Sequence, residues 1–113
     1  VGRVIEVPEK LHDAATAVSG SGPAYVFLVA EAMIDAAVAM GLPRDQASQL
    51  TVATLAGSAE LLAGDEHPAV LRSEVTSPGG TTAAALAELE AGGLRATFAD
   101  AMTACRDRAA GVS

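Results

Sequence analysis

Apolar positions recur at helical spacing from Pro8 to the end of the chain, and proline or glycine marks most boundaries between the apolar stretches. Proline fits the first turn of a helix, and glycine fits the residue just beyond the last turn. On this basis the pattern predicts helices over 8–18, 23–40, 43–63, 81–91 and 94–110. It also predicts a short helical turn that begins within the segment 65–68 and extends through residue 74. The expected fold class is therefore all-α.

The helix expected over 23–40 is apolar nearly all round in its first half, which is typical of a helix that is buried on every side. Half of the residues are apolar, yet only Tyr25, Phe27 and Phe98 are aromatic. A monomer of this composition lacks the large aromatic anchors that usually dominate a core. We therefore expect part of the apolar surface to be buried against a second copy of the chain.

The first seven residues follow another pattern, because Val1–Val7 alternates in the β manner and is rich in β-branched side chains. Pro8 is expected to end this short strand. The helical remainder offers the strand no partner, so we expect 1–7 to be the trailing strand of a domain absent from this sequence. Residues 8–113 would form the helical domain.

Charge and composition exclude several classes of function. The net charge is −7 and the pI is near 4.6, whereas nucleic acids and anionic membranes require clustered Lys and Arg. The uninterrupted apolar run 24–30 is much shorter than the roughly 20 residues of a membrane span. With Cys105 alone and His12 far from His67, neither a disulfide nor a metal site is expected. A cytoplasmic location is the default expectation.

The segment 76–82, Thr-Ser-Pro-Gly-Gly-Thr-Thr, leads directly into the apolar helix expected from 81. Glycines allow a ligand to approach the backbone closely, and the free N–H groups of a first helical turn favour an anion. The hydroxyls of Ser77, Thr81 and Thr82 add neutral donors. One interpretation is a site for a small carboxylate or phosphate; the alternative is an ordinary helix cap with turn glycines.

Two other segments favour structural roles. Gly20-Ser21-Gly22-Pro23 looks like a phosphate loop, but it follows a helix rather than a strand, so a helix-breaking turn is the preferred interpretation. His67 could act in acid–base chemistry, but a histidine beside a proline at a helix start more often caps the helix. No dinucleotide-binding glycine fingerprint is found in the chain.

Several motifs together resemble the C-terminal domain of pyrroline-5-carboxylate reductases, in order and spacing over nearly the whole chain. They are the segments 17–27 (AVSGSGPAYVF), 41–44 (GLPR), 66–68 (EHP), 76–82 (TSPGGTT) and 89–95 (LEAGGLR). The resemblance implies an interlocking helical dimerisation domain that follows an N-terminal Rossmann domain. The family reduces 1-pyrroline-5-carboxylate to L-proline with NADPH or NADH, and its dimers can assemble further.

The resemblance also implies roles for individual residues. Ser77 and the backbone amides of Gly80, Thr81 and Thr82 would hold the substrate carboxylate, and Gly79 would belong to the same substrate-binding loop. The catalytic contact would be that of the Thr82 hydroxyl with the ring nitrogen. Glu66 would help to line the pocket. Without the cofactor domain, this chain alone is expected to bind no dinucleotide and to be inactive. Two alternatives stay open: a non-catalytic helical dimerisation module and a small-carboxylate-binding domain.

Overall fold

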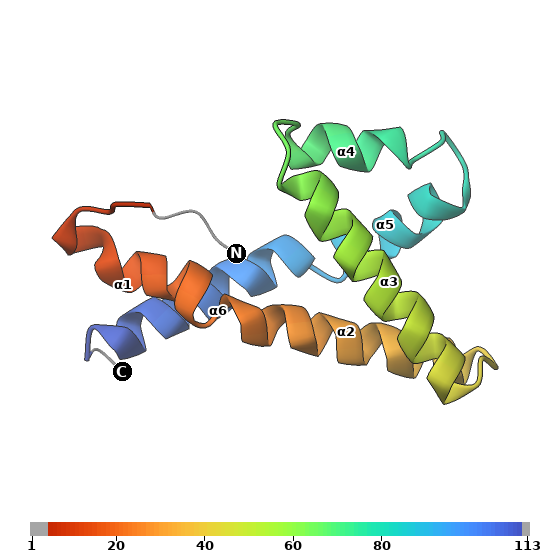
Figure 1. The fold of residues 1–113 in the computed structure, drawn as a ribbon, viewed down its shortest axis with the longest axis horizontal. Coiled ribbons are helices and arrows are strands. Elements are labelled where there is room, and N and C mark those ends of the chain that lie inside the picture. Colours follow the sequence, from red (N-terminus) through yellow and green to blue (C-terminus); the bar gives the residue numbers. More distant parts are fainter. Residues whose placement is uncertain (1–4, 112–113) are drawn as a thin grey trace. The chain divides into compact units, whose positions relative to one another are not determined.

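The computed structural model describes residues 5–111, and every regular element among them is helical (Figure 1). The elements are the 3₁₀ turn η1 (Glu9–Leu11), α1 (His12–Ala15), the π-helical turn η2 (Thr16–Gly20), α2 (Gly22–Ala39), α3 (Arg44–Leu62), α4 (Pro68–Glu74), α5 (Thr81–Ala91) and α6 (Leu94–Ala109). The all-α prediction is confirmed, and α5 has the predicted bounds.

The predicted N-terminal strand is not seen in the part of the chain that the structure describes. Residues 1–4 lie outside the described residues, and Ile5–Val7 has no regular secondary structure. An extended segment becomes a strand only when a second strand completes its hydrogen bonds, and the described residues contain no strand to pair with it. Residues 5–7 instead lead into η1.

Glycine ends α2 in the manner expected from the sequence. Gly41, with φ of 109°, donates its N–H to the Val38 carbonyl oxygen at 2.9 Å, and the Leu42 N–H reaches the Ala37 oxygen at 3.1 Å. This is the pattern of a Schellman cap, in which a left-handed residue lets the chain turn back on the helix end. Pro43 then caps α3 at its start, so α2 and α3 are joined by a short connection.

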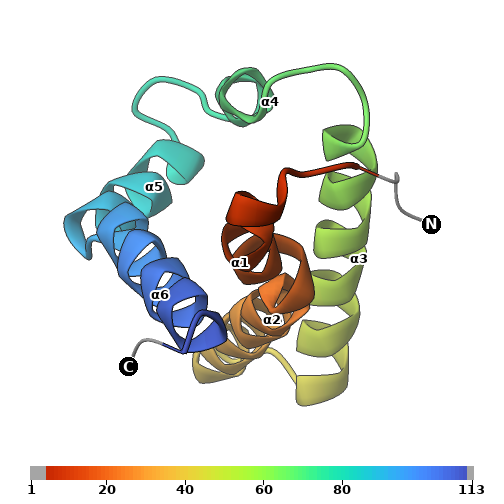
Figure 2. The same cartoon turned by 90° about the vertical axis from the view of Figure 1, so that its left-hand side faces the viewer.

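The chain folds as two units, and the first unit contains the described residues 5–26 and 93–111. In this unit α6 packs against α1 and η2, and Figure 2 shows α6 beside α1. The Tyr25 and Phe98 rings meet edge to face with their centroids 6.1 Å apart. The Cys105 thiol lies 3.1 Å from the Ser21 hydroxyl oxygen, and Cys105 is a half-buried packing residue.

The second unit, residues 27–92, contains the remainder of α2 together with α3, α4 and α5. Its described contacts between elements include α3 against α4. An exposed ion pair between Arg44 and Asp35, with 3.3 Å between nitrogen and oxygen, links the start of α3 to the last turns of α2. Ala47 is fully buried and Thr51 nearly so, whereas no large hydrophobic side chain is fully buried among the described residues.

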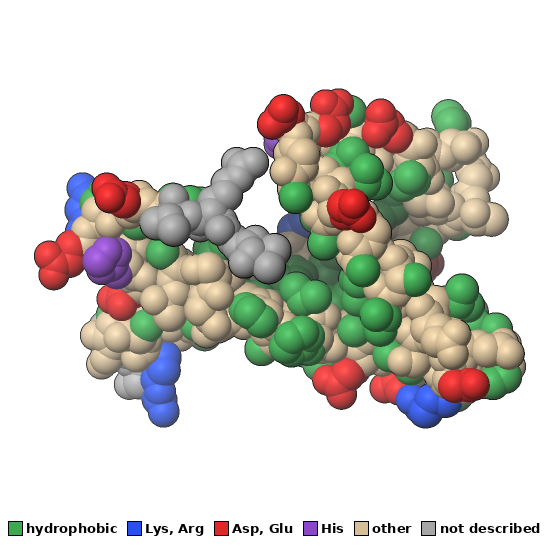
Figure 3. Space-filling model, in the orientation of Figure 1, with side chains coloured by type: hydrophobic (Ala, Val, Ile, Leu, Met, Phe, Trp, Pro, Cys, Tyr) green, Lys and Arg blue, Asp and Glu red, His purple; other side chains and the backbone are tan. Residues whose placement is uncertain are grey.

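Large hydrophobic side chains are instead exposed along α2 and α3, and Figure 3 shows them as extended green surface over these helices. Phe27 and Leu28 are each 66 % exposed, and no residue of α2 is buried within the chain. The sequence predicts that α2 is buried on every side. A single chain does not supply that burial, so the surface that would cover α2 has to come from outside this chain.

The helical stretch from Glu9 to Ala39 is long and apolar enough to cross a membrane by length and composition, with a mean hydropathy of 1.5 in its most apolar window. The uninterrupted apolar run 24–30 is only a part of this stretch. Core helices of soluble proteins satisfy the same criterion.

Candidate anion site at the start of α5

The Ser-Pro-Gly-Gly segment is a tight turn between α4 and α5. The Gly80 N–H donates to the Ser77 carbonyl oxygen at 3.0 Å, which closes a four-residue turn. Pro78 occupies the second position, and Gly79 occupies the third with φ of 69°. Proline followed by a left-handed glycine is the signature of a type II turn, so these two residues give the loop a defined shape.

The turn leaves the N-terminus of α5 open. Gly80 is the N-cap residue and has no side chain to cap the helix. No described residue accepts a hydrogen bond from the N–H groups of Thr81, Thr82 and Ala83. These three donors lie at the positive end of the helix dipole, which favours a negatively charged group.

Gly80 contributes to the site through its small size rather than through its own N–H. A Cβ atom at this position would lie 3.3 Å from the Ser77 carbonyl oxygen and 3.4 Å from the Ser77 Cβ, which is tighter than ordinary contact. Because the Gly80 N–H already bonds to Ser77, the free amide donors begin at Thr81.

The three hydroxyls expected at the site have no hydrogen-bond partner among the described residues. Ser77 and Thr81 are exposed, and Thr82 is half-buried. Thr76 differs from them, because its hydroxyl donates to the Arg72 carbonyl oxygen at 2.6 Å and so closes the last turn of α4. The turn therefore presents free amides and free hydroxyls on one short segment, with no Lys or Arg within it.

Glu66 and His67 directly precede α4, at the end of that helix away from the Ser-Pro-Gly-Gly turn. Seven helical residues rise about 10 Å, so within one chain Glu66 is not brought to the turn at Ser77. His67 caps α4: its Nδ1 atom accepts a hydrogen bond from the Ala69 N–H at 3.0 Å. The structural interpretation of His67 is therefore confirmed.

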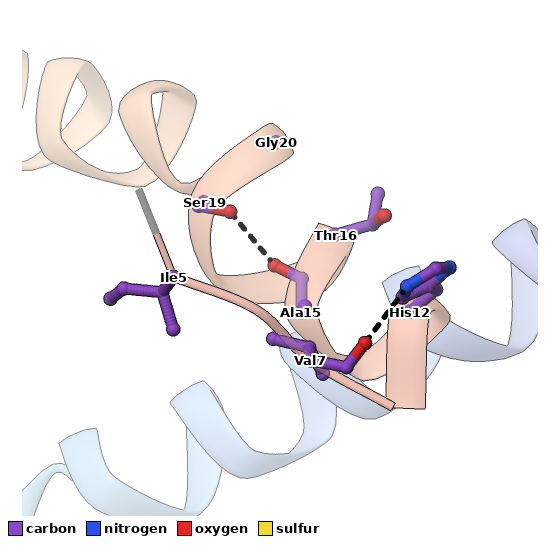
Figure 4. Close-up of a pocket in the computed structure, with 7 residues that line it drawn as sticks. All are labelled: Ile5, Val7, His12, Ala15, Thr16, Ser19 and Gly20. Carbon is purple, nitrogen blue, oxygen red and sulfur yellow. Dashed lines mark hydrogen bonds between the residues drawn. The ribbon is translucent and has the colours of Figure 1, made fainter. Parts of the chain in front are cut away.

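The helices break within the Gly20–Pro23 segment, as predicted, but the break is confined to Ser21: Gly20 ends a π-helical turn that the sequence did not reveal, and Gly22 begins α2. The Ser21 N–H reaches back to the Thr16 carbonyl oxygen at 2.9 Å. An open groove of about 360 Å³ beside this turn is lined by Ile5, Val7, His12, Ala15, Thr16, Ser19 and Gly20 (Figure 4).

Two polar side chains of this groove are engaged within the chain. His12 Nε2 lies 3.1 Å from the Val7 carbonyl oxygen, and the Ser19 hydroxyl donates to the Ala15 carbonyl oxygen. These bonds give both side chains a structural role there.

Fold and surface together define a class of protein: an all-helical domain whose apolar helices are left uncovered within one chain and which presents free neutral donors at the start of α5. The family model described as "Pyrroline-5-carboxylate reductase dimerisation" matches residues 9–112. The chain belongs to this family.

Curated relatives of this chain are named pyrroline-5-carboxylate reductases. A pyrroline-5-carboxylate reductase of Synechocystis is 52 % identical over 109 residues, and one of Arabidopsis thaliana is 49 % identical over 109 residues. Each alignment covers 96 % of this chain but 41 % and 40 % of the relative. The chain thus spans about two fifths of the length of the relatives it matches.

Solved structures of reductases have the same fold over this region. A pyrroline-5-carboxylate reductase from Coxiella burnetii matches with a TM-score of 0.89 at 43 % identity, over 96 % of this chain and 40 % of that one. A Plasmodium falciparum pyrroline carboxylate reductase, described with NADP bound, matches with a TM-score of 0.87 at 40 % identity, over 95 % of this chain and 43 % of that one.

Proposed function

We propose that this chain is the substrate-binding and dimerisation half of a pyrroline-5-carboxylate reductase, which reduces 1-pyrroline-5-carboxylate to L-proline with NADPH or NADH in the cytoplasm. The observation that carries the proposal is the uncapped N-terminus of α5 behind a rigid Ser-Pro-Gly-Gly turn, in a chain of this family. This cluster of free donors favours the proposal over a dimerisation module without a ligand.

The described residues do not fit a dinucleotide. They form no parallel sheet and the chain has no glycine fingerprint after a strand, which are the features that cradle a pyrophosphate. In this proposal a Rossmann domain elsewhere in the complete protein binds the cofactor, residues 1–7 connect to it, and residues 8–113 form the helical domain. The cofactor would supply the hydride.

The substrate carboxylate would be bound at the start of α5. The N–H groups of Thr81 and Thr82 and the Ser77 hydroxyl offer neutral donors to its two oxygens, and the helix dipole adds a favourable field. Gly79 sets the turn, and Gly80 completes it at a point where a Cβ atom would crowd Ser77. These residues hold one end of the substrate and so orient its ring.

Thr82 would act at the other end of the substrate. Its hydroxyl would donate to the ring nitrogen, whose lone pair becomes a stronger acceptor as the C=N bond is reduced. A contact that strengthens in this way stabilises the transition state more than the bound substrate. Ser77 differs, because the carboxylate keeps its charge throughout the reaction.

The apolar surface of α2 and α3 would be covered by a second copy in an interlocking homodimer. Obligate interfaces of this kind are large and hydrophobic, which matches the exposure of Phe27 and Leu28. In the dimer the partner copy would bring its own Glu66 and loop, so the contribution of Glu66 to a pocket would depend on assembly.

An assay of the complete protein tests this function. When the complete protein is added to 1-pyrroline-5-carboxylate and NADPH, the absorbance of the reduced nicotinamide should fall only if the substrate is present, and proline should be formed. The 113-residue chain alone should give no turnover and no heat of NADPH binding in calorimetry. Absence of turnover by the complete protein with either nicotinamide cofactor would contradict the proposal.

A further inference from the structure

The first turn of α4 depends on one residue for all its backbone donors. The Ala69 N–H donates to His67 Nδ1 at 3.0 Å. The N–H groups of Val70 and Leu71 donate to the His67 carbonyl oxygen at 2.9 and 3.1 Å, and Pro68 has no N–H to satisfy. A helix of seven residues is too short to be stable by itself, so this cap matters more here than in a long helix.

The cap requires a neutral imidazole. An imidazole accepts a hydrogen bond at Nδ1 only when its proton is on Nε2, and an imidazolium has no acceptor at all. Protonation would also place a positive charge at the positive end of the α4 dipole. Both effects act in the same direction, so protonation of the imidazole removes the cap.

The charged groups nearest to His67 are acidic, so they favour the imidazolium and with it the loss of the cap, but only weakly. Asp65 and Glu66 precede it directly, and Glu60 lies on the last turn of α3, the helix that contacts α4. Acidic side chains gather over α4 and the adjoining end of α3 in Figure 3. Among the described residues, none of these three forms an ion pair with His67, so they act as exposed, screened charges.

The other end of α4 is tied to the anion site. The Ser73 hydroxyl donates to the Val70 carbonyl oxygen at 2.7 Å, and the Thr76 hydroxyl donates to the Arg72 oxygen at 2.6 Å. Thr76 is the residue directly before Ser77. The helix therefore connects the His67 cap at one end to the Ser-Pro-Gly-Gly turn at the other.

We propose that His67 is a pH-sensitive positioning residue: its neutral imidazole caps α4 and thereby holds the turn at Ser77 in the form that binds the carboxylate. The link to substrate binding rests on the proposed function, whereas the loss of the cap in acid does not. Histidine is suited to this because imidazole is the side chain whose charge ordinarily changes between about pH 5 and pH 8.

Two substitutions of His67 distinguish the role of its hydrogen-bond acceptor from the effect of its protonation. In His67→Asn the side-chain oxygen replaces Nδ1, is a favoured N-cap acceptor and does not titrate, whereas in His67→Gln the polar group is displaced toward the position of Nε2. Hydrogen exchange of the Ala69 amide is then measured in the full chain between pH 5 and 8. At pH 8 the protection of the Ala69 amide in the wild type should equal that in His67→Asn. At pH 5 it should be about fivefold lower in the wild type than in His67→Asn. In His67→Gln the protection of this amide should be low at both pH values.

The kinetic arm uses the complete protein. The KM for 1-pyrroline-5-carboxylate should rise several-fold from pH 8 to pH 5 in the wild type relative to His67→Asn, with the ratio of kcat values unchanged. Equal protection of Ala69 in wild type and His67→Asn at every pH would overturn the inference, as would a KM ratio independent of pH. Complete lack of reductase activity would count against the proposed function, and the exchange data would then decide the cap by themselves.

Discussion

The Tyr25 hydroxyl donates a 2.7 Å hydrogen bond to the carbonyl oxygen of Ala17, and this bond joins the first turn of α2 to the π-helical turn before it. Ala17 is buried, with 2 % of its surface exposed. Desolvation, and then the neighbouring Cys105 thiol, raise the pKa of the Tyr25 phenol above its ordinary value. One polar side chain thus ties the helical break to the packing of α6.

The raised pKa of Tyr25 can be measured directly, because Tyr25 is the single tyrosine of a chain without tryptophan. Absorbance of the phenolate during alkaline titration should give a midpoint above about 10, the ordinary value. Cys105→Ala should lower that midpoint in part, because desolvation of the phenol is the larger cause and stays. A midpoint at the ordinary value in the folded protein would contradict this description of the cluster.

The raised pKa of Tyr25 also makes the free energy of unfolding depend on pH. The folded state holds the phenol proton more tightly than the unfolded state, so the contribution of Tyr25 is complete below about pH 10, where the unfolded phenol titrates. It is lost as the pH rises through the folded pKa. Urea unfolding at pH 8 and at pH 11 should show that Tyr25→Phe loses less stability on this change of pH than the wild type does.

Leu28 tests the expectation that the chain is an obligate dimer. Leu28 is 66 % exposed in the single chain, so Leu28→Glu should cost little in an isolated protomer but should place a charge in an apolar interface. Sedimentation velocity should show the dimer in the wild type and its loss in Leu28→Glu. Glu88→Gln, on exposed surface of α5, is the control and should leave the dimer intact. A stable folded wild-type monomer at micromolar concentration would refute the expectation.

Gly79 tests the importance of the shape of the turn. Its φ of 69° is strained for an L side chain, although a Cβ atom there would meet nothing within 4 Å. Gly79→Ala should therefore cost about 1–2 kcal/mol through backbone strain alone. Gly79→Asn is the matched variant and should cost less, because asparagine tolerates this conformation. Chemical denaturation measures both; equal costs would mean that the turn relaxes to another conformation.

The sequence predicted the helices well because proline and glycine mark their ends. The predicted bounds of α5 match the structure, and a glycine follows the last turn of α2 as the general rule for helix ends predicts. The Ser-Pro-Gly-Gly-Thr-Thr segment was also identified as a helix start from its composition. These features depend on short-range chemistry, which one sequence contains.

Features that depend on hydrogen-bond geometry or on a second chain could not be predicted in this way. The engagement of the Gly80 N–H with Ser77 depends on the shape of the turn, and the π-helical turn at Thr16–Gly20 has no sequence signature. Ile5–Val7 looks like a strand by pattern, but pairing needs a neighbour. The burial of α2 was predicted from its apolar surface, yet the covering surface is not in this chain.

The central claim is that the start of α5 binds and activates the substrate, and Thr82 tests it most directly. Thr82→Ala in the complete protein removes a hydroxyl whose contact should strengthen as the ring nitrogen is reduced, so kcat should fall, whereas Ser77→Ala should mainly raise KM. If Thr82 served only helix stability, its loss would cost about 1 kcal/mol or less in folding without a change in turnover. Steady-state kinetics and a thermal melt on the same Thr82→Ala preparation distinguish these results. The account predicts a lowered kcat with a nearly unchanged melting temperature; an unchanged kcat with a lowered melting temperature would contradict it.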